Sequence, residues 1–192
     1  MSVGYIELNR FVREKLPEKR YNHSLGVVEM SIHLASLFRL SVTDAACIAI
    51  FHDAYRYDCD EGTAELCRKS GIEVFPEEEK EPMLLHGALA ALHFDEVAGP
   101  VPSKWKIAVR HHTLGSKEMG KYGAILYIAD YMEPGRKHLN DDDRQRILSG
   151  ERLEDMIITI MDMQGEYFER EGIKSAEVSD ELYDYIKSGG LL

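Results

Sequence analysis

Apolar residues recur at spacings of three and four along nearly the whole chain, while alternating runs of β-branched residues are absent. This periodicity is typical of amphipathic helices and argues against strands. The sequence has neither an internal repeat nor a linker-like segment. We therefore expect an all-α fold, a single helical bundle domain over residues 1–192 with C-terminal helices over about 151–188.

Proline and glycine divide the periodic stretches into separate helices. Pro17 ends the first helix, Gly71 follows the fourth and Pro134 stops the seventh, while Ser41 offers an N-cap to the third. The segment 76–82 is expected to be an acidic connector. The predicted helices cover about 3–16, 19–38, 45–54, 61–70, 83–97, 104–112, 122–131, 152–171 and 178–188.

The third predicted helix is apolar on most sides, so it should be central, and it ends in His52-Asp53. Cores rarely hold an ionised carboxylate without a partner. An imidazole beside a carboxylate at the end of such a helix therefore points to a bound cation.

Further candidates stand at the ends of other predicted helices. They are His23, His86, the pair His111-His112 and Asp130. A site of two histidines and two aspartates suits a divalent metal such as iron, manganese, zinc or magnesium. Periodicity alone does not show that these residues meet in space.

The remaining histidines, the cysteines and the acidic runs are interpreted as structural rather than functional. His33, His93 and His138 are interpreted as surface or core residues, and the cysteines as packing residues. The acidic runs 77–79 and 141–143 are interpreted as solvated faces or helix starts.

Composition narrows the class of partner. The 192 residues carry a formal net charge of −11, which argues against a nucleic-acid polymer but leaves room for a small anion at a local positive site. Three cysteines without a CxxC motif favour a reducing, cytoplasmic compartment. No stretch is apolar over the roughly 18 residues of a membrane span, and the N-terminus lacks the apolar stretch of a signal peptide.

The order of the motifs is more specific than any one of them. The chain reads RYNHSLGVVE, IAIFHDAYRYD, LLHGALAA, AVRHHTLG and LYIADYMEPGR between residues 20 and 136. This succession resembles the HD-domain metal phosphohydrolases, with their plan H…HD…D, and among them the YqeK-like bacterial symmetrical diadenosine tetraphosphatases. The HSLG, HTxG and ADYxEPGR elements are more specific than the HD dipeptide.

The resemblance implies a role for each matching position. It places the metal, usually iron, on His23, His52, Asp53 and Asp130. It places nucleotide contacts at Gly26, His86, His112, Thr113 and Arg136, and near residues 170–172. It also implies that Asp53 and Arg56 take part in catalysis.

The chain departs from the family pattern in three places. The family commonly has HD-Tyr-Ala-Lys where this chain has Ala54, Tyr55 and Arg56 after the HD pair, so a guanidinium replaces an ammonium. The segment 58–81 is longer and more acidic than is usual, and His111 stands where a tyrosine is common. These differences bear on rate and nucleotide specificity.

These residues together predict a hydrolase that acts on a small nucleotide. A metal-bound hydroxide would attack a phosphoanhydride, and symmetrical cleavage of diadenosine tetraphosphate would yield two ADP. Apolar helix faces near the termini would permit a homodimer. Three alternatives stay open: an HD phosphohydrolase for another nucleotide, a non-catalytic nucleotide-binding module, and a helical protein with structural histidines.

Overall fold

The structure is a computed structural model and describes residues 4–192. These residues form helices joined by turns and loops, and none of them lies in a strand, so the all-α prediction is confirmed. In chain order the elements are α1 (Tyr5–Lys15), α2 (Glu18–Leu37), α3 (Val42–Phe51), α4 (Thr63–Lys69), α5 (Pro76–Lys80), the 3-10 helix η1 (Pro82–Leu85), α6 (His86–Ala98), α7 (Ser103–His111), α8 (Gly120–Met132), α9 (Asp141–Leu148), α10 (Leu153–Glu171) and α11 (Glu177–Lys187).

Helix α3 is the central element, as its apolar sequence predicts. Every residue from Ala45 to Phe51 is buried, and the helix packs against α1, α2, α7 and α8. At its start the Ser41 hydroxyl accepts a hydrogen bond from the backbone N–H of Asp44 (3.2 Å), which is the predicted N-cap. At its end the Phe51 ring stacks on Phe94 with centroids 4.2 Å apart. The core thus fixes both ends of the helix that leads into the HD pair.

The predicted end of the third helix differs from the structure. The third helix ends at Phe51 rather than near Ala54, because the chain turns tightly there: the Ala54 N–H donates to the Phe51 carbonyl and the Arg56 N–H donates to that of Asp53, both at 3.0 Å. Consequently the HD pair lies in a turn, not on a helix. The sequence also predicts a helix start near Val3, which lies outside the described residues.

The acidic segment 76–82 is ordered as α5 and the start of η1 rather than forming a plain connector. The run 77–79 lies in the first turn of α5, as predicted for a helix start, whereas the buried Glu78 corrects the alternative interpretation as a solvated face. Its carboxylate accepts two hydrogen bonds from the Arg110 guanidinium, at 2.6 and 2.9 Å. Arg110 also donates to the Glu73 carbonyl (2.8 Å) and lies over the Phe75 ring. The longer acidic segment is therefore anchored to α7.

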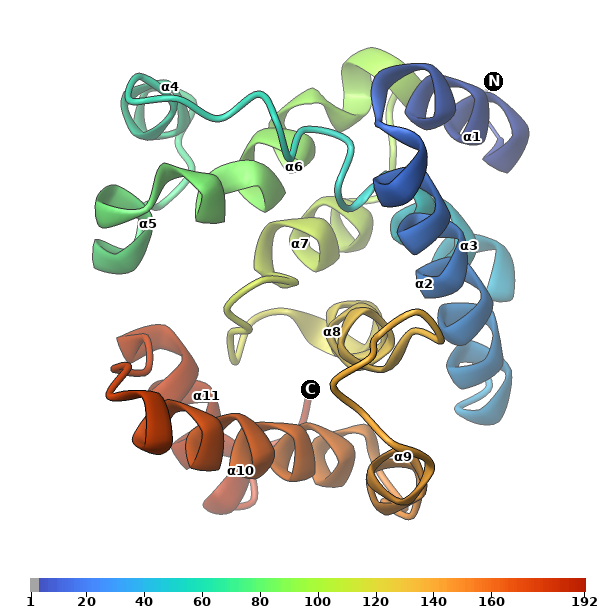
Figure 1. Ribbon diagram of the computed structural model, residues 1–192. Coiled ribbons are helices and arrows are strands. Elements are labelled where there is room, and N and C mark those ends of the chain that lie inside the picture. The colour runs from blue at the N-terminus through green and yellow to red at the C-terminus, as the bar shows by residue number, and fades with distance from the viewer. Residues whose placement is uncertain (1–3) are drawn as a thin grey trace.

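The C-terminal helices cover another side of the core. Helix α10 packs against α8, α9 and α11, while α2 packs against α8 from a different side (Figure 1). The acidic run 141–143 opens α9 behind the N-cap Asn140, as predicted for a helix start. Among residues 4–192, no helix combines the length and apolar character needed to cross a membrane.

Candidate metal centre

Four side chains singled out in the sequence converge on one point. His23 comes from α2, His52 and Asp53 come from the turn after α3, and Asp130 lies near the end of α8. Nε2 of His23 lies 3.0 Å from Oδ1 of Asp130 and 3.6 Å from Oδ2 of Asp53. Nε2 of His52 lies 3.2 Å from Oδ2 of Asp53. The fold brings together residues more than one hundred positions apart in the chain.

Three histidines of the site are oriented in the same way. In each, Nδ1 contacts the backbone carbonyl of the residue three positions earlier. Because a carbonyl only accepts hydrogen bonds, Nδ1 carries the proton, and the lone pair of the neutral ring is on Nε2. The pairs are His52 with Ala49 (2.6 Å), His86 with Met83 (2.6 Å) and His112 with Val109 (2.7 Å).

The fourth ring, His23, is oriented by a residue that the sequence reasoning missed. Nδ1 of His23 lies 3.1 Å from Oε1 of Glu133, a buried carboxylate whose other oxygen accepts from the Gly135 N–H (2.5 Å). Glu133 stands three residues after Asp130 inside the ADYMEPGR element, so the spacing offered a signal. A carboxylate behind a histidine is a common arrangement at metal sites.

Gly26 packs directly against this carboxylate. A Cβ at position 26 would lie 2.7 Å from Oε2 of Glu133, which is closer than real side chains approach. The resemblance to the family implies that Gly26 contacts the nucleotide, and the residue does border a cavity described below. The structure adds a packing reason for the glycine.

The cluster fits a cation. Nε2 of His23, Nε2 of His52 and both oxygens of Asp53 are buried, yet none makes a hydrogen bond within residues 4–192. One ligand atom each from His23, His52 and Asp130 lies within 4.8 Å of the others, and His52, Asp53 and His112 form a second, overlapping group. Buried carboxylates facing imidazole lone pairs need a positive charge between them. Nitrogen and oxygen donors of this kind suit a divalent metal.

The predicted nucleotide contacts border the same point. Nε2 of His86 lies 3.1 Å from Oδ1 of Asp53 and 3.0 Å from Nε2 of His112. The Thr113 hydroxyl lies 3.3 Å from the same His112 nitrogen. Nη1 of Arg56 is 3.3 Å from Nε2 of His86, so the Arg56 guanidinium reaches the cluster.

Two further arginines neutralise the carboxylates. Arg136 donates to Oδ1 of Asp130 (2.6 Å) and to its backbone carbonyl (2.9 Å). Nη1 of Arg20 lies 2.9 Å from Oδ2 of Asp53. Arg20 was not among the predicted site residues, although it stands three positions before His23 on one helix.

Burial and neighbouring charges set the ionisation of the site. Burial, reinforced by His86 and His52, lowers the pKa of His112 to about 3, so this ring is neutral at pH 7. Burial alone would raise the pKa of Asp53, but the electrostatic influence of His52 and His86 holds it well below its usual value. The pKa of Asp130 is also lowered, because His23, His52 and Arg136 outweigh burial. Both aspartates are therefore ionised.

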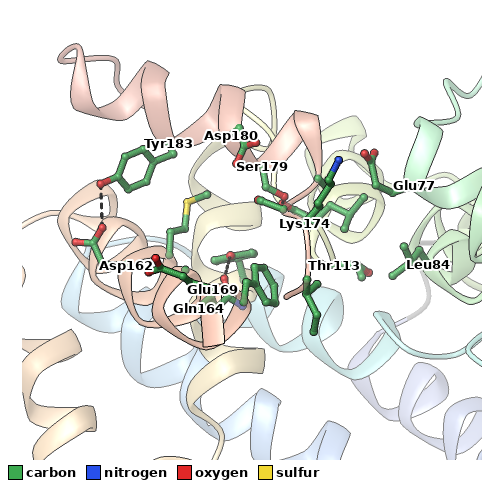
Figure 2. Close-up of a pocket in the computed structure, with 18 residues that line it drawn as sticks. Glu77, Leu84, Thr113, Asp162, Gln164, Glu169, Lys174, Ser179, Asp180 and Tyr183 are labelled. Atoms are coloured by element: carbon green, nitrogen blue, oxygen red, sulfur yellow. Dashed lines mark hydrogen bonds between the residues drawn. The ribbon is translucent and has the colours of Figure 1, made fainter. Parts of the chain in front are cut away.

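Two cavities open beside the cluster. The first, the C-terminal cavity, has a volume of about 700 Å³ and lies between α10, α11 and the loop after α7. Figure 2 shows Glu77 and Leu84 on one side and Asp162, Gln164 and Glu169 of α10 on another. The second, the α2 cavity, has a volume of about 850 Å³ and lies between the start of α2 and the turn after α8.

The residues that carry this geometry fall within a known family. The profile of the HD domain matches residues 20–135, a span that contains all four converging side chains. The chain belongs to the HD-domain family. Membership agrees with the phosphohydrolase resemblance read from the sequence, and the HD pair of this domain is His52-Asp53.

Relatives in two bacteria are named "Bis(5'-nucleosyl)-tetraphosphatase, symmetrical". The Staphylococcus aureus protein is 33% identical over 136 residues, which is 70% of this chain and 69% of that protein. The Bacillus subtilis protein is 30% identical over 138 residues, which is 71% and 73% of the two chains. The expected resemblance to this group of HD-domain proteins is confirmed.

A solved structure shares nearly the whole fold. It is a Clostridium acetobutylicum protein described as a "predicted HD superfamily hydrolase involved in NAD metabolism". The similarity covers 98% of this chain and 99% of that one, with a TM-score of 0.86 and 28% sequence identity. The likeness extends through α10 and α11, beyond the residues that the family profile matches.

Proposed function

We propose that the protein is a metal-dependent phosphohydrolase that cleaves a nucleotide phosphoanhydride, and specifically diadenosine tetraphosphate into two ADP. The observation that carries this proposal is the convergence of His23, His52, Asp53 and Asp130, in which the facing atoms of the first three residues are buried without a hydrogen-bond partner. The arginines around this cluster supply the positive charge that a polyphosphate requires. The names of the bacterial relatives support the choice of substrate.

A divalent cation would be held by these four side chains. Iron is our first choice, with manganese, zinc and magnesium as the alternatives to be tested. When bound, such a cation activates water as a nucleophile and stabilises the negative charge that develops on the phosphate. The structural observation behind this assignment is again the set of buried atoms that lack partners.

The chain's own groups position the substrate and the water. Asp53 is ionised and buried, so a free lone pair of its carboxylate accepts a hydrogen bond from the attacking water and orients it. Arg56 and Thr113 both contact His86 beside Asp53, and these three groups bind phosphate oxygens as the bridging bond breaks. Arg136 holds Asp130 in place and keeps part of its guanidinium exposed for a phosphate.

The C-terminal cavity is the place for one nucleoside. Thr113 lies on its wall (Figure 2). The same residue contacts His112, so the cavity begins beside the groups that we assign to the phosphates. Tyr127 and Phe168 provide apolar and aromatic surface for a base, and the Tyr127 hydroxyl donates to Gln164 (2.9 Å). This placement agrees with the expectation of nucleotide contacts near residues 170–172, since the cavity includes Glu169 and Ile173.

A second candidate is hydrolysis of a different nucleotide at the same centre. Glu77, which belongs to the longer acidic segment 58–81, lines the C-terminal cavity and brings a carboxylate to the proposed nucleoside site. That carboxylate would favour a base or sugar with additional hydrogen-bond donors. A link to NAD metabolism in the description of the structural neighbour points to nucleotides of this wider class.

The test is a substrate and metal panel with purified protein. We expect diadenosine tetraphosphate to give only ADP, and we expect iron(II) to support the fastest turnover. Asp53→Asn should lower kcat at least about a hundredfold. His33→Ala, which changes an exposed histidine on α2, serves as the matched control and should leave kcat unchanged.

The remaining outcomes separate the alternatives. ATP plus AMP would contradict symmetrical cleavage, and preferred hydrolysis of a mononucleotide or NAD-like compound would favour the second candidate. Tight nucleotide binding without product under every metal would support a non-catalytic module. Absence of both metal and nucleotide binding would support structural histidines.

A further inference from the structure

The α2 cavity and the C-terminal cavity approach the metal cluster through different residues. His23 and Arg136 line the α2 cavity, whereas Thr113 lines the C-terminal cavity. The two sets of lining residues have no member in common, and the contacts His23 to Asp53 and His86 to Asp53 connect them through the cluster. A molecule bound at the cluster therefore has room to extend in two directions.

The two cavities differ in charge. The α2 cavity contains Lys19 and Lys137, exposed lysines that form no salt bridge within the described part of the chain. Arg20 and Arg136 also line it, and of its two carboxylates Glu29 and Glu133, the second is already engaged by His23. The C-terminal cavity has one lysine, Lys174, facing four carboxylates, those of Glu77, Asp162, Glu169 and Asp180 (Figure 2). On an acidic protein, the α2 cavity is therefore the better place for phosphates.

An aromatic ring stands at the edge of the same cavity. Tyr57 follows the turn that carries Asp53 and Arg56, and 58% of its surface is exposed. An exposed aromatic face beside cationic side chains is a common platform for a nucleobase attached to phosphates.

We propose that the α2 cavity binds the second nucleoside diphosphate half of a symmetrical dinucleotide. This proposal rests on the proposed function and extends it. Lys19 and Lys137 contact the phosphates of that half, and Tyr57 stacks on its base. The two halves of the substrate are chemically identical, yet they occupy pockets of unlike charge, one acidic and the other cationic. Cleavage at the cluster between the pockets then gives two equal products.

The experiment compares two ligands in the metal-loaded protein. Diadenosine tetraphosphate carries both bases, whereas adenosine 5'-tetraphosphate lacks the second base and serves as a competitive inhibitor. Tyr57→Ala should lower kcat/KM for the dinucleotide about tenfold while leaving the inhibition constant of the tetraphosphate within about twofold. The double variant Lys19→Ala/Lys137→Ala should weaken the binding of both ligands about fivefold, because both carry the distal phosphates. This loss appears as a lower kcat/KM for the dinucleotide and a higher inhibition constant for the tetraphosphate.

Lys121→Ala is the matched control. Lys121 is an exposed lysine on α8 that lies in neither cavity, so its replacement should change neither constant. Because Tyr57, Lys19 and Lys137 are all exposed, their replacement should leave the circular dichroism and Tm unchanged.

If kcat/KM for the dinucleotide and the inhibition constant of the tetraphosphate both stay within twofold of wild type in the two variants, the assignment of the second half to this cavity is overturned. If Tyr57→Ala weakens inhibition by the tetraphosphate by the same factor as it lowers kcat/KM for the dinucleotide, the stacking role of Tyr57 is overturned. If wild-type protein hydrolyses no dinucleotide with any metal, the proposed function itself fails, which is a separate and recognisable result.

Discussion

Nδ1 of His23 and Oε1 of Glu133 lie 3.1 Å apart, although the two residues are 110 positions apart in the chain. This contact turns Nε2 of His23 toward Asp53 and Asp130. The backbone carbonyls behind His52, His86 and His112 do the same for those rings. A site with every Nδ1 occupied presents four Nε2 atoms inward, and Glu133 is the only side chain among the four acceptors.

Replacing Glu133 should therefore weaken metal binding. Glu133→Ala removes the acceptor and leaves His23 free to rotate, so we expect the metal Kd to rise about 10- to 100-fold. Isothermal titration with the metal-free protein measures this directly. Glu133→Gln keeps an oxygen acceptor and should retain most of the affinity. Equal affinity in Glu133→Ala and wild type would show that the contact does not orient the ring.

Gly26 should not tolerate a side chain. In Gly26→Ala the new methyl group meets Oε2 of Glu133, so either the carboxylate or α2 must move. We expect lower metal affinity together with a loss of stability of about 1–3 kcal/mol. Chemical denaturation and metal titration of the same samples provide the two readouts.

Gly165 in α10 provides the matched substitution. A Cβ there meets no atom within 4 Å, so Gly165→Ala should stabilise the protein by about 0.5–1 kcal/mol and leave metal affinity unchanged. Equal changes in stability and metal affinity in Gly26→Ala and Gly165→Ala would contradict the packing argument for Gly26.

The pair Glu78–Arg110 should be important for stability because both side chains are buried. Glu78→Ala leaves the Arg110 guanidinium without its carboxylate, and we expect a loss of about 3–5 kcal/mol in the free energy of unfolding. Glu79→Ala removes the exposed pair with Arg68 and should cost about 1 kcal/mol or less. Urea denaturation distinguishes them, and equal losses would show that segment 58–81 is not anchored through Glu78.

Arg56 should act mainly through its charge. Arg56→Ala removes the cation next to His86 and Asp53, so we expect kcat for the dinucleotide to fall at least about tenfold. Arg56→Lys restores the residue type common in the family and should keep most of the rate. Steady-state kinetics at saturating metal measures both. A fully active Arg56→Ala enzyme would remove Arg56 from the chemistry.

Much of the site was predictable because motifs mark it. The apolar run of α3 ending in His52-Asp53 predicted a buried cation site, and the similarity of the motifs joined His23 and Asp130 to it. The exact end of α3 was not predictable, since the turn at Ala54 depends on hydrogen bonds between i and i+3 that no side chain signals.

Contacts between distant segments escaped the sequence analysis for a physical reason. Glu133 and Arg20 act on side chains of other elements, and helical periodicity reports only which face of one helix is apolar. The burial of Glu78 likewise depends on Arg110, 32 positions away. The two cavities arise where helices from different parts of the chain meet, so their volumes and charges required the structure.

The most direct test of the account is a crystal structure of the metal-loaded protein with anomalous diffraction data collected at the absorption edge of the bound metal. We predict one anomalous peak within about 2.0–2.3 Å of Nε2 of His23, Nε2 of His52 and carboxylate oxygens of Asp53 and Asp130. A protein that retains no metal, or a peak bound by other residues while these four side chains contact only one another, would contradict it.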